Sequence, residues 1–230
     1  NKSTKGMKLS KGKAIFYDNH PRLLASAHKI SMIHKINYDG DIKKQEFRFG
    51  NEFSFLNGYQ IEALIEAENE LFNGVQFDNM LEVAIGVTGK LNVKTKIHGG
   101  IVSKNQIIRY LDIPEQTDLY GTWGYIEYKI SDQANVAIGA QYEDAKNYYD
   151  GFLINSWYTH SFTSKLSLRT KIQYSDFSHN WFVEPLLTYQ PTAFSALYFG
   201  MNELLSTEDG MFSNLTESER QLFVKFQYLF

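Results

Sequence analysis

The stretch "RQLFVKFQYLF", residues 220–230, decides the fold of this chain. Its alternate residues are apolar or aromatic: Leu222, Val224, Phe226, Tyr228 and Phe230. Gln221, Lys225 and Gln227 fall between them, although Phe223 and Leu229 interrupt this polar set. Side chains alternate across an extended chain, so the pattern predicts a strand with one apolar and one polar face. The apolar face would pack on a core in a soluble sheet and against lipid in a membrane barrel.

The rest of the chain repeats this alternation. Twelve segments show it, at 23–37, 43–56, 59–73, 80–88, 91–103, 120–131, 134–144, 151–162, 165–175, 180–189, 193–204 and 218–230. Globular strands most often have about 5–6 residues, whereas a tilted strand needs about 9–11 to cross a bilayer. The length of these segments therefore favours a membrane barrel. The alternative at 61–72 is an amphipathic helix, because Glu and Ala favour helices, and that would spoil the even strand count.

The predicted connections alternate in length. Tight links with ordinary turn residues fall at 57–58, 88–90, 131–133, 163–164 and 190–192. The intervening links are mostly longer and more polar, at 38–42, 74–79, 104–119, 145–150, 176–179 and 205–217. Short turns on one side and long loops on the other are typical of outer-membrane barrels. We therefore expect short periplasmic turns and longer extracellular loops.

Composition excludes several classes of protein. The 230 residues include no cysteine, which excludes disulfide scaffolds and thiolate metal sites. The formal net charge of −3 does not indicate nucleic-acid binding. No window approaches the ~18 apolar residues of a transmembrane helix. The beginning of the sequence has no signal-peptide pattern, so we expect a mature or truncated form.

The C-terminal stretch resembles the signature of Gram-negative outer-membrane β-barrel proteins. In that family a terminal Phe, preceded by aromatic or aliphatic residues at alternate positions, is read by the barrel-assembly machinery. The residues that match are Leu222, Val224, Phe226, Tyr228 and Phe230. More narrowly, the stretch is similar to the endings of Bacteroidota barrels that follow a carbohydrate-binding-like domain. That resemblance implies that the chain is the C-terminal part of a larger protein.

One face of the predicted strands is assigned to lipid. Three of its sets are Leu81, Val83, Ile85 and Val87; Val136, Ile138, Ala140 and Tyr142; and Leu166, Leu168, Thr170, Ile172 and Tyr174. Aromatic residues lie near the ends of such sets, where rings prefer the headgroup region. We expect two girdles, with Tyr142, Tyr174 and Trp181 on the loop side and Phe162 and Tyr189 on the turn side.

The opposite face is assigned to the lumen. It carries carboxylates from the early strands, chiefly Glu62, Glu66, Glu68 and Glu70, and cations from later ones, chiefly Lys94, Lys96, Arg169, Lys171 and Lys225. Across a water-filled pore these groups would set up a transverse field that favours hydrophilic solutes. Alternatively, the side chains meet in the middle as a salt-bridged plug, because a lumen of this size can be filled by long side chains.

Metal and enzyme hypotheses gain little from the sequence. Clustered carboxylates on 61–72 can bind Ca²⁺, but they more often form a solvated face, and we expect no metal or cofactor. Outer-membrane phospholipases carry a His-x-Ser-Asn-Gly stretch, which does not follow His98, His160 or His179. Ser175, Ser178 and His179 are the nearest candidates for a hydrolase, and a nucleophile and base must share one rim to act.

The sequence thus predicts an all-β protein: a closed antiparallel transmembrane β-barrel of about 12 strands over 23–230, with residues 1–22 as a periplasmic tail or partial plug. We expect a porin-like channel for small hydrophilic solutes in the outer membrane. A closed accessory barrel of a larger envelope complex is the alternative, and a membrane-embedded hydrolase is the weakest. The expected partners are outer-membrane lipid and lipopolysaccharide, the assembly machinery and envelope-complex subunits, and not nucleic acid.

Overall fold

A computed structural model describes residues 5–8, 12–14, 23–37, 40, 42–208 and 211–228. Within these ranges no helix has the length and apolar character that a membrane span requires. For residues 5–8 and 12–14 the description covers the backbone. Phe230, the last residue of the predicted assembly signature, lies outside the described residues, as does most of the predicted tail at 1–22.

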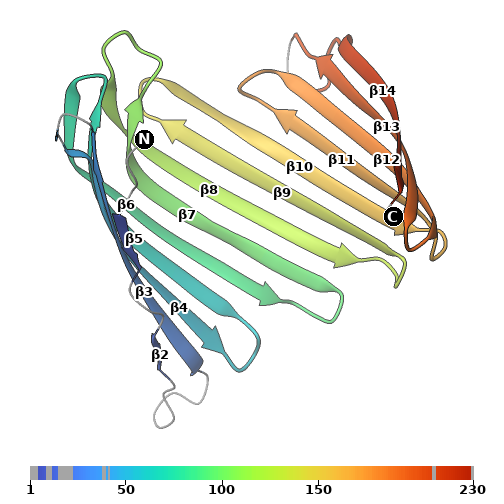
Figure 1. Ribbon diagram of the computed structural model, residues 1–230, viewed down its shortest axis with the longest axis horizontal. Coiled ribbons are helices and arrows are strands. Elements are labelled where there is room, and N and C mark those ends of the chain that lie inside the picture. The colour runs from blue at the N-terminus through green and yellow to red at the C-terminus, as the bar shows by residue number, and fades with distance from the viewer. Residues whose placement is uncertain are drawn as a thin grey trace. The chain divides into compact units, whose positions relative to one another are not determined.

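Antiparallel strands form one sheet in the described part of the chain (Figure 1). The order is β1-β3-β4-β5-β6-β7-β8-β9-β10-β11-β12-β13-β14, and β2 also pairs with β3. The short strands are β1 (Lys5–Lys8) and β2 (Gly12–Ala14). The long strands are β3 (Leu23–Ile36), β4 (Ile42–Phe55), β5 (Gln60–Phe72), β6 (Val75–Lys90), β7 (Thr95–Ile108), β8 (Glu115–Lys129), β9 (Ala134–Ala145), β10 (Tyr149–Ser161), β11 (Leu166–Ser175), β12 (Asn180–Thr192), β13 (Ser195–Ser206) and β14 (Thr216–Tyr228).

Two compact units divide the chain. Unit 1 comprises residues 1–90, 98–122 and 143–149, and unit 2 comprises residues 91–97, 123–142 and 150–230. The predicted twelve-strand antiparallel organisation is confirmed, since each predicted segment overlaps one strand from β3 to β14. Residues 61–72 belong to β5 and not to a helix. The long strands have between 10 residues, in β11, and 16 residues, in β6.

Tight turns set the register of the hairpins. In the β4–β5 turn, Gly58 has a φ of 82° and its N–H donates to the Phe55 carbonyl at 3.0 Å. Asn73 and Gly74 form the β5–β6 turn with φ values of 48° and 79°. Two consecutive positive φ values match the twist of hairpin strands, and Asn-Gly accepts them at low cost. The expected longer loop at 74–79 is therefore wrong, and the predicted asymmetry of the connections is smaller than expected.

Part of the N-terminal region pairs with the edge of β3. We expected residues 1–22 to form a periplasmic tail or partial plug, with no full extra strand. In the described part of this range, β1 pairs antiparallel with β3 from Lys5↔His34 to Lys8↔Ser31, and β2 pairs from Gly12↔His28 to Ala14↔Ser26. The outer edge of β3 offers unpaired N–H and C=O groups, and such an edge attracts any extended segment nearby.

Alternation gives each unit an exposed apolar face. In unit 1, Leu81, Val83, Ile85 and Val87 of β6 are 38–47% exposed, and they pair with Ala67, Ile65, Ala63 and Ile61 of β5. In unit 2, Leu222, Val224, Phe226 and Tyr228 of β14 are 53–68% exposed and share their face with Leu197, Phe199 and Met201 of β13. The buried apolar cluster of the described residues is small and consists of Phe77, Met80 and Ile107. Each unit therefore leaves an apolar face of its strands exposed.

Candidate functional site

Carboxylates gather on the polar face of unit 1. The β4–β5 register sets Glu46 opposite Glu68 and Glu52 opposite Glu62, and the β5–β6 register sets Glu66 opposite Glu82. We call this surface the carboxylate wall; its members are Glu46, Glu52, Glu62, Glu66, Glu68, Glu70 and Glu82. Like charges directly opposite each other destabilise a sheet unless cations lie between them. The wall therefore requires partners close at hand.

Lys44 supplies the first of these partners. Its Nζ lies 2.9 Å from a Glu68 oxygen and 3.1 Å from a Glu46 oxygen. The Glu46 side chain is only 6% exposed, and that of Glu68 is 16% exposed. One ammonium group thus bridges two facing carboxylates that are largely removed from water, where ion pairs are screened less than at an open surface.

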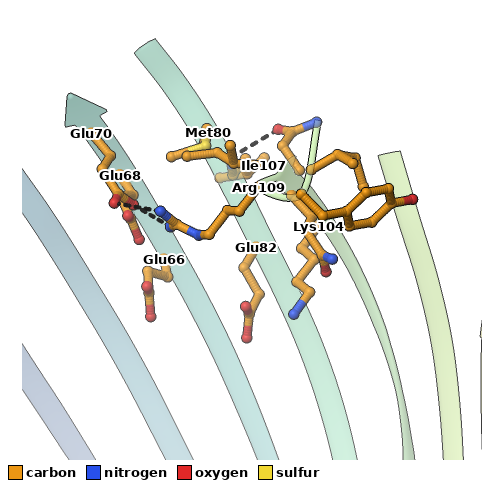
Figure 2. Close-up of a pocket in the computed structure, with 13 residues that line it drawn as sticks. Glu66, Glu68, Glu70, Met80, Glu82, Lys104, Ile107 and Arg109 are labelled. Atoms are coloured by element: carbon orange, nitrogen blue, oxygen red, sulfur yellow. Dashed lines mark hydrogen bonds and ion pairs between the residues drawn. The ribbon is translucent and has the colours of Figure 1, made fainter. Parts of the chain in front are cut away.

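Two arginines complete the neutralisation. The Arg48 Nε donates to Glu66 Oε2 at 2.5 Å, and its Nη2 lies 3.6 Å from Glu46. Arg109, which follows β7, forms a fork with both Glu70 oxygens at 3.0 and 2.8 Å (Figure 2). Its guanidinium group also lies over the Phe72 ring. Bidentate pairs of this kind are among the stronger hydrogen bonds in proteins. Hydrogen bonding to Glu70 raises the pKa of Arg109, so the pair stays charged.

A hollow of about 440 Å³ lies against this wall (Figure 2). Its lining includes Glu66, Glu68, Glu70 and Glu82 on one side and Lys104 and Arg109 from β7 and the residue that follows it. Such an arrangement presents both signs of charge to a hydrophilic solute at close range.

The carboxylates that were considered as a calcium site already contact cations. Oxygens of Glu46, Glu66 and Glu68 lie within 4.8 Å of one another. Lys44 and Arg48 contact these same carboxylates. Ca²⁺ needs six to eight oxygen ligands, and here the ammonium and guanidinium groups already take the carboxylate oxygens.

The polar face of unit 2 carries mainly cations. Lys96 lies 3.3 Å from Glu127, and Arg169 lies 4.0 Å from Glu184. Lys171 and Lys225 lie over the rings of Phe182 and Tyr198, each 5.9 Å from the ring centroid. Rings attract cations at such distances through their quadrupole. These four predicted lumen cations lie on strands, as expected.

Lys94 departs from the prediction. It lies in the turn before β7, where its N–H donates to Asn92 Oδ1 at 2.8 Å. An Asn side chain that caps its own turn in this way ends the strand earlier than alternation alone suggests. Lys94 is therefore not part of a strand wall.

The sequence analysis set the carboxylates of the early strands against the cations of later strands. The carboxylate wall is instead neutralised by cations of its own unit. Glu66, Glu68 and Glu70 find Arg48, Lys44 and Arg109 inside unit 1. These partners were missed because strands were compared by charge and not by register. The turn at 56–58 pairs Phe55 with Tyr59 and is centred on Asn57. It therefore sets Arg48 opposite Glu66 and Lys44 opposite Glu70, since residues equidistant from the centre of a turn pair.

The predicted girdle residues separate into two groups. Tyr142, Phe162 and Tyr189 are 41–47% exposed. Tyr174 is only 1% exposed, because its ring packs against those of Phe152 and Trp181, with centroids 5.6 Å and 5.1 Å away. Trp181 in turn stacks on Phe212 and donates from Nε1 to the Met211 carbonyl at 2.6 Å. Tyr174 is thus not an exposed girdle residue, because the β13–β14 loop closes over its neighbour.

The candidates for the weakest alternative, a hydrolase, make no catalytic contact with one another. Ser178 and His179 lie in the β11–β12 turn, where the His179 carbonyl accepts from the Thr207 N–H at 2.8 Å. Among the described residues, no hydrogen bond joins the side chains of Ser175, Ser178 and His179 to one another. The turn has a structural role at this point.

Comparison with known proteins finds no matching family model and no matching curated protein. Among solved structures, a KdgM porin in complex with disordered oligogalacturonate aligns with a TM-score of 0.36 and 13% identity, over 89% of this chain and 99% of that chain. A second KdgM porin structure gives 0.36 and 14%, with the same coverage. A NanC porin gives 0.38 and 14%, over 81% of this chain and 94% of that chain. At these TM-scores the alignments do not establish a shared fold.

Proposed function

We propose that this chain is an outer-membrane β-barrel that forms a porin-like channel for small hydrophilic solutes. The observation that carries the proposal is the division of its strands into an exposed apolar face and a charged, hydrogen-bonded face. Leu81, Val83, Ile85 and Val87 alternate with Glu82, Ala84, Gly86 and Thr88 along a single strand. Outer-membrane barrels place the first kind of face against lipid and the second around a lumen.

Strand length supports the same proposal. A tilted strand needs about 9–11 residues to cross a membrane. Each of the twelve long strands has at least 10. All of them are antiparallel and follow chain order from β3 to β14. In our proposal the sheet closes into a barrel, since open sheet edges do not occur in the hydrocarbon region.

The ion pairs support an open lumen over a plugged one. Lys44, Arg48 and Arg109 neutralise their carboxylates along the wall itself, within unit 1. These groups therefore need no partner from across a lumen, and a hollow of about 440 Å³ remains beside them. The alternative is a closed accessory barrel of an envelope complex, whose channel would be silent.

The cellular setting belongs to the proposal as well. The apolar face would contact outer-membrane lipid and lipopolysaccharide, with short turns toward the periplasm. Leu222, Val224, Phe226 and Tyr228 share an exposed face of β14, which supports a role for this segment and Phe230 in recognition by the barrel-assembly machinery. Deleting Phe230 should then lower the folded, heat-modifiable fraction in outer membranes while synthesis continues.

Single-channel recording in planar bilayers tests the function directly. The folded, heat-modifiable protein should give ohmic current steps in 1 M KCl (about 3 Å Debye length, so that wall charges are screened). Heat-denatured protein from the same preparation serves as the control and should give no steps. Stable insertion without current would reject the channel and favour the accessory barrel.

A further inference from the structure

A serine, a histidine and an asparagine form a hydrogen-bonded chain on the apolar face of β3 and β4. Ser26 and His28 are two residues apart on β3, so their side chains lie on the same face. His28 faces Asn51 of β4 across the ladder. The Ser26 Oγ lies 3.5 Å from His28 Nε2, and His28 Nδ1 lies 2.5 Å from Asn51 Oδ1. Each ring nitrogen of His28 thus has its own hydrogen-bond partner.

These contacts define the tautomer of His28. The Asn51 Oδ1 is a carbonyl oxygen and can only accept, so His28 Nδ1 must carry the proton that it donates. In the neutral ring Nε2 is then left with its lone pair toward the Ser26 hydroxyl. An imidazole oriented by one group and facing a hydroxyl with the other nitrogen is the arrangement that activates a serine nucleophile.

Neighbouring rings hold the imidazole in place. Phe49 and Phe53 lie on the same face of β4 as Asn51, one on each side of it. The Phe49 ring stacks on His28 with an interplanar angle of 4°, and the Phe53 ring meets it edge-on at 83°. Both centroids are 6.5 Å from the His28 centroid. The ring therefore keeps the orientation that points Nε2 at Ser26.

We propose that Ser26, His28 and Asn51 form a catalytic triad that hydrolyses carboxylic esters. The Ser26 Oγ attacks the ester carbonyl carbon while His28 Nε2 takes the hydroxyl proton. The carbon–oxygen bond to the alcohol breaks, and the leaving alkoxide takes that proton from His28. Water then attacks the acyl-serine, His28 accepts its proton and returns it to Ser26 Oγ, and the carboxylic acid leaves. Asn51 is a positioning residue that holds the Nδ1–H tautomer.

The surroundings indicate an amphiphilic substrate with an aliphatic acyl chain. Ile30 and Met32 continue the same face of β3 and are 39% and 52% exposed. This choice of substrate class rests on the proposed function, in which that face meets lipid. A membrane lipid ester would bring its acyl chain along Ile30 and Met32 and its carbonyl to Ser26.

The N-terminal strand controls access to the nucleophile. Ser26 is only 2% exposed, and β2 pairs with the segment of β3 that carries Ser26 and His28, at Gly12↔His28, Lys13↔Ala27 and Ala14↔Ser26. Substrate therefore reaches Ser26 when β2 separates from β3. Proline lacks the N–H that a ladder needs, so Lys13→Pro weakens this pairing without touching the triad.

Labelling with a long-chain alkyl fluorophosphonate tests the triad in the full-length folded protein. The Ser26 Oγ forms a bond to phosphorus as fluoride leaves, and mass spectrometry locates the adduct. We expect labelling at Ser26 in the parent protein, several-fold faster labelling in Lys13→Pro, and no adduct in Ser26→Ala. His28→Gln should lower the rate by about 100-fold, in keeping with the loss of a general base. Asn51→Ala should lower it less, and Asn51→Asp should restore it.

Matched controls come from the same strand. Ser31→Ala changes a serine that shares its face with Arg48, and His34→Gln changes a histidine whose Nδ1 accepts from Gln45 at 3.3 Å. Neither should change labelling at Ser26. Folded protein without an adduct in both the parent and Lys13→Pro would overturn the triad. A protein that conducts but is not labelled contradicts this inference alone, and one that is labelled but silent contradicts only the channel.

Discussion

The polar faces of the two units hold their charges in different ways. In unit 1, Lys44 and Arg109 approach carboxylates to 2.8–3.1 Å, and Glu46 and Glu66 are largely buried among these cations. In unit 2, Arg169 stays 4.0 Å from Glu184, and Lys171 and Lys225 rest above aromatic rings. The comparison shows that the carboxylate wall of unit 1 depends on close ion pairs, whereas Arg169, Lys171 and Lys225 of unit 2 make longer contacts, at 4.0–5.9 Å.

The largest expected effect breaks a pair in unit 1. Arg48→Met should lower the free energy of unfolding by about 3–5 kcal/mol, because it leaves the shielded carboxylates of Glu46 and Glu66 short of a cation. Arg169→Met in unit 2 should cost less than about 1 kcal/mol, since that side chain is 58% exposed. Urea titrations of protein folded into lipid vesicles measure both. Equal losses would remove the distinction between the walls.

A second prediction compares the two faces of unit 2. Ile138→Arg places a charge on the apolar face of β9, where Ile138 is 53% exposed, and should cost about 2–4 kcal/mol in a bilayer. Ser167→Arg is the control, because Ser167 shares the polar face with Arg169 and Lys171. We expect it to change vesicle-folded stability little. The reverse ranking in urea titrations would mean that the faces have been exchanged.

An aromatic ring on the polar face of unit 2 also covers the backbone. Disturbing it should change the free energy of unfolding less than the two changes above. Phe223 interrupts the polar alternation of β14 because its ring lies over Gly200, its cross-strand partner. A Cβ at Gly200 would overlap this ring, so Gly200→Ala should lower the free energy of unfolding by about 1–2 kcal/mol. Gly124→Ala meets nothing within 4 Å and should be neutral. Thermal unfolding in detergent compares them, and equal stability would contradict a role for the ring.

The strands could be predicted from the sequence because alternation is local, as in 220–228. The partners of the wall could not be found by charge alone, since Arg48 and Glu66 meet only through the register that the turn at 56–58 sets. The burial of Tyr174 depends on a loop that begins at residue 207, 33 residues later in the chain. A local sequence pattern around Tyr174 therefore could not predict it. The proposed triad escaped the motif search because Ser26 precedes His28 and Asn51 joins them from another strand.

The central claim is that one face of these strands meets lipid and the other meets water. Because the chain has no cysteine, single cysteines at positions 81–87 of β6 can carry spin labels without further changes. In vesicles, collision with oxygen should peak at 81, 83, 85 and 87, and collision with a water-soluble nickel complex should peak at 82, 84 and 86. Two accessibilities that alternate out of phase agree with the account. Accessibilities that rise and fall together, or that lack a period of two residues, would contradict it.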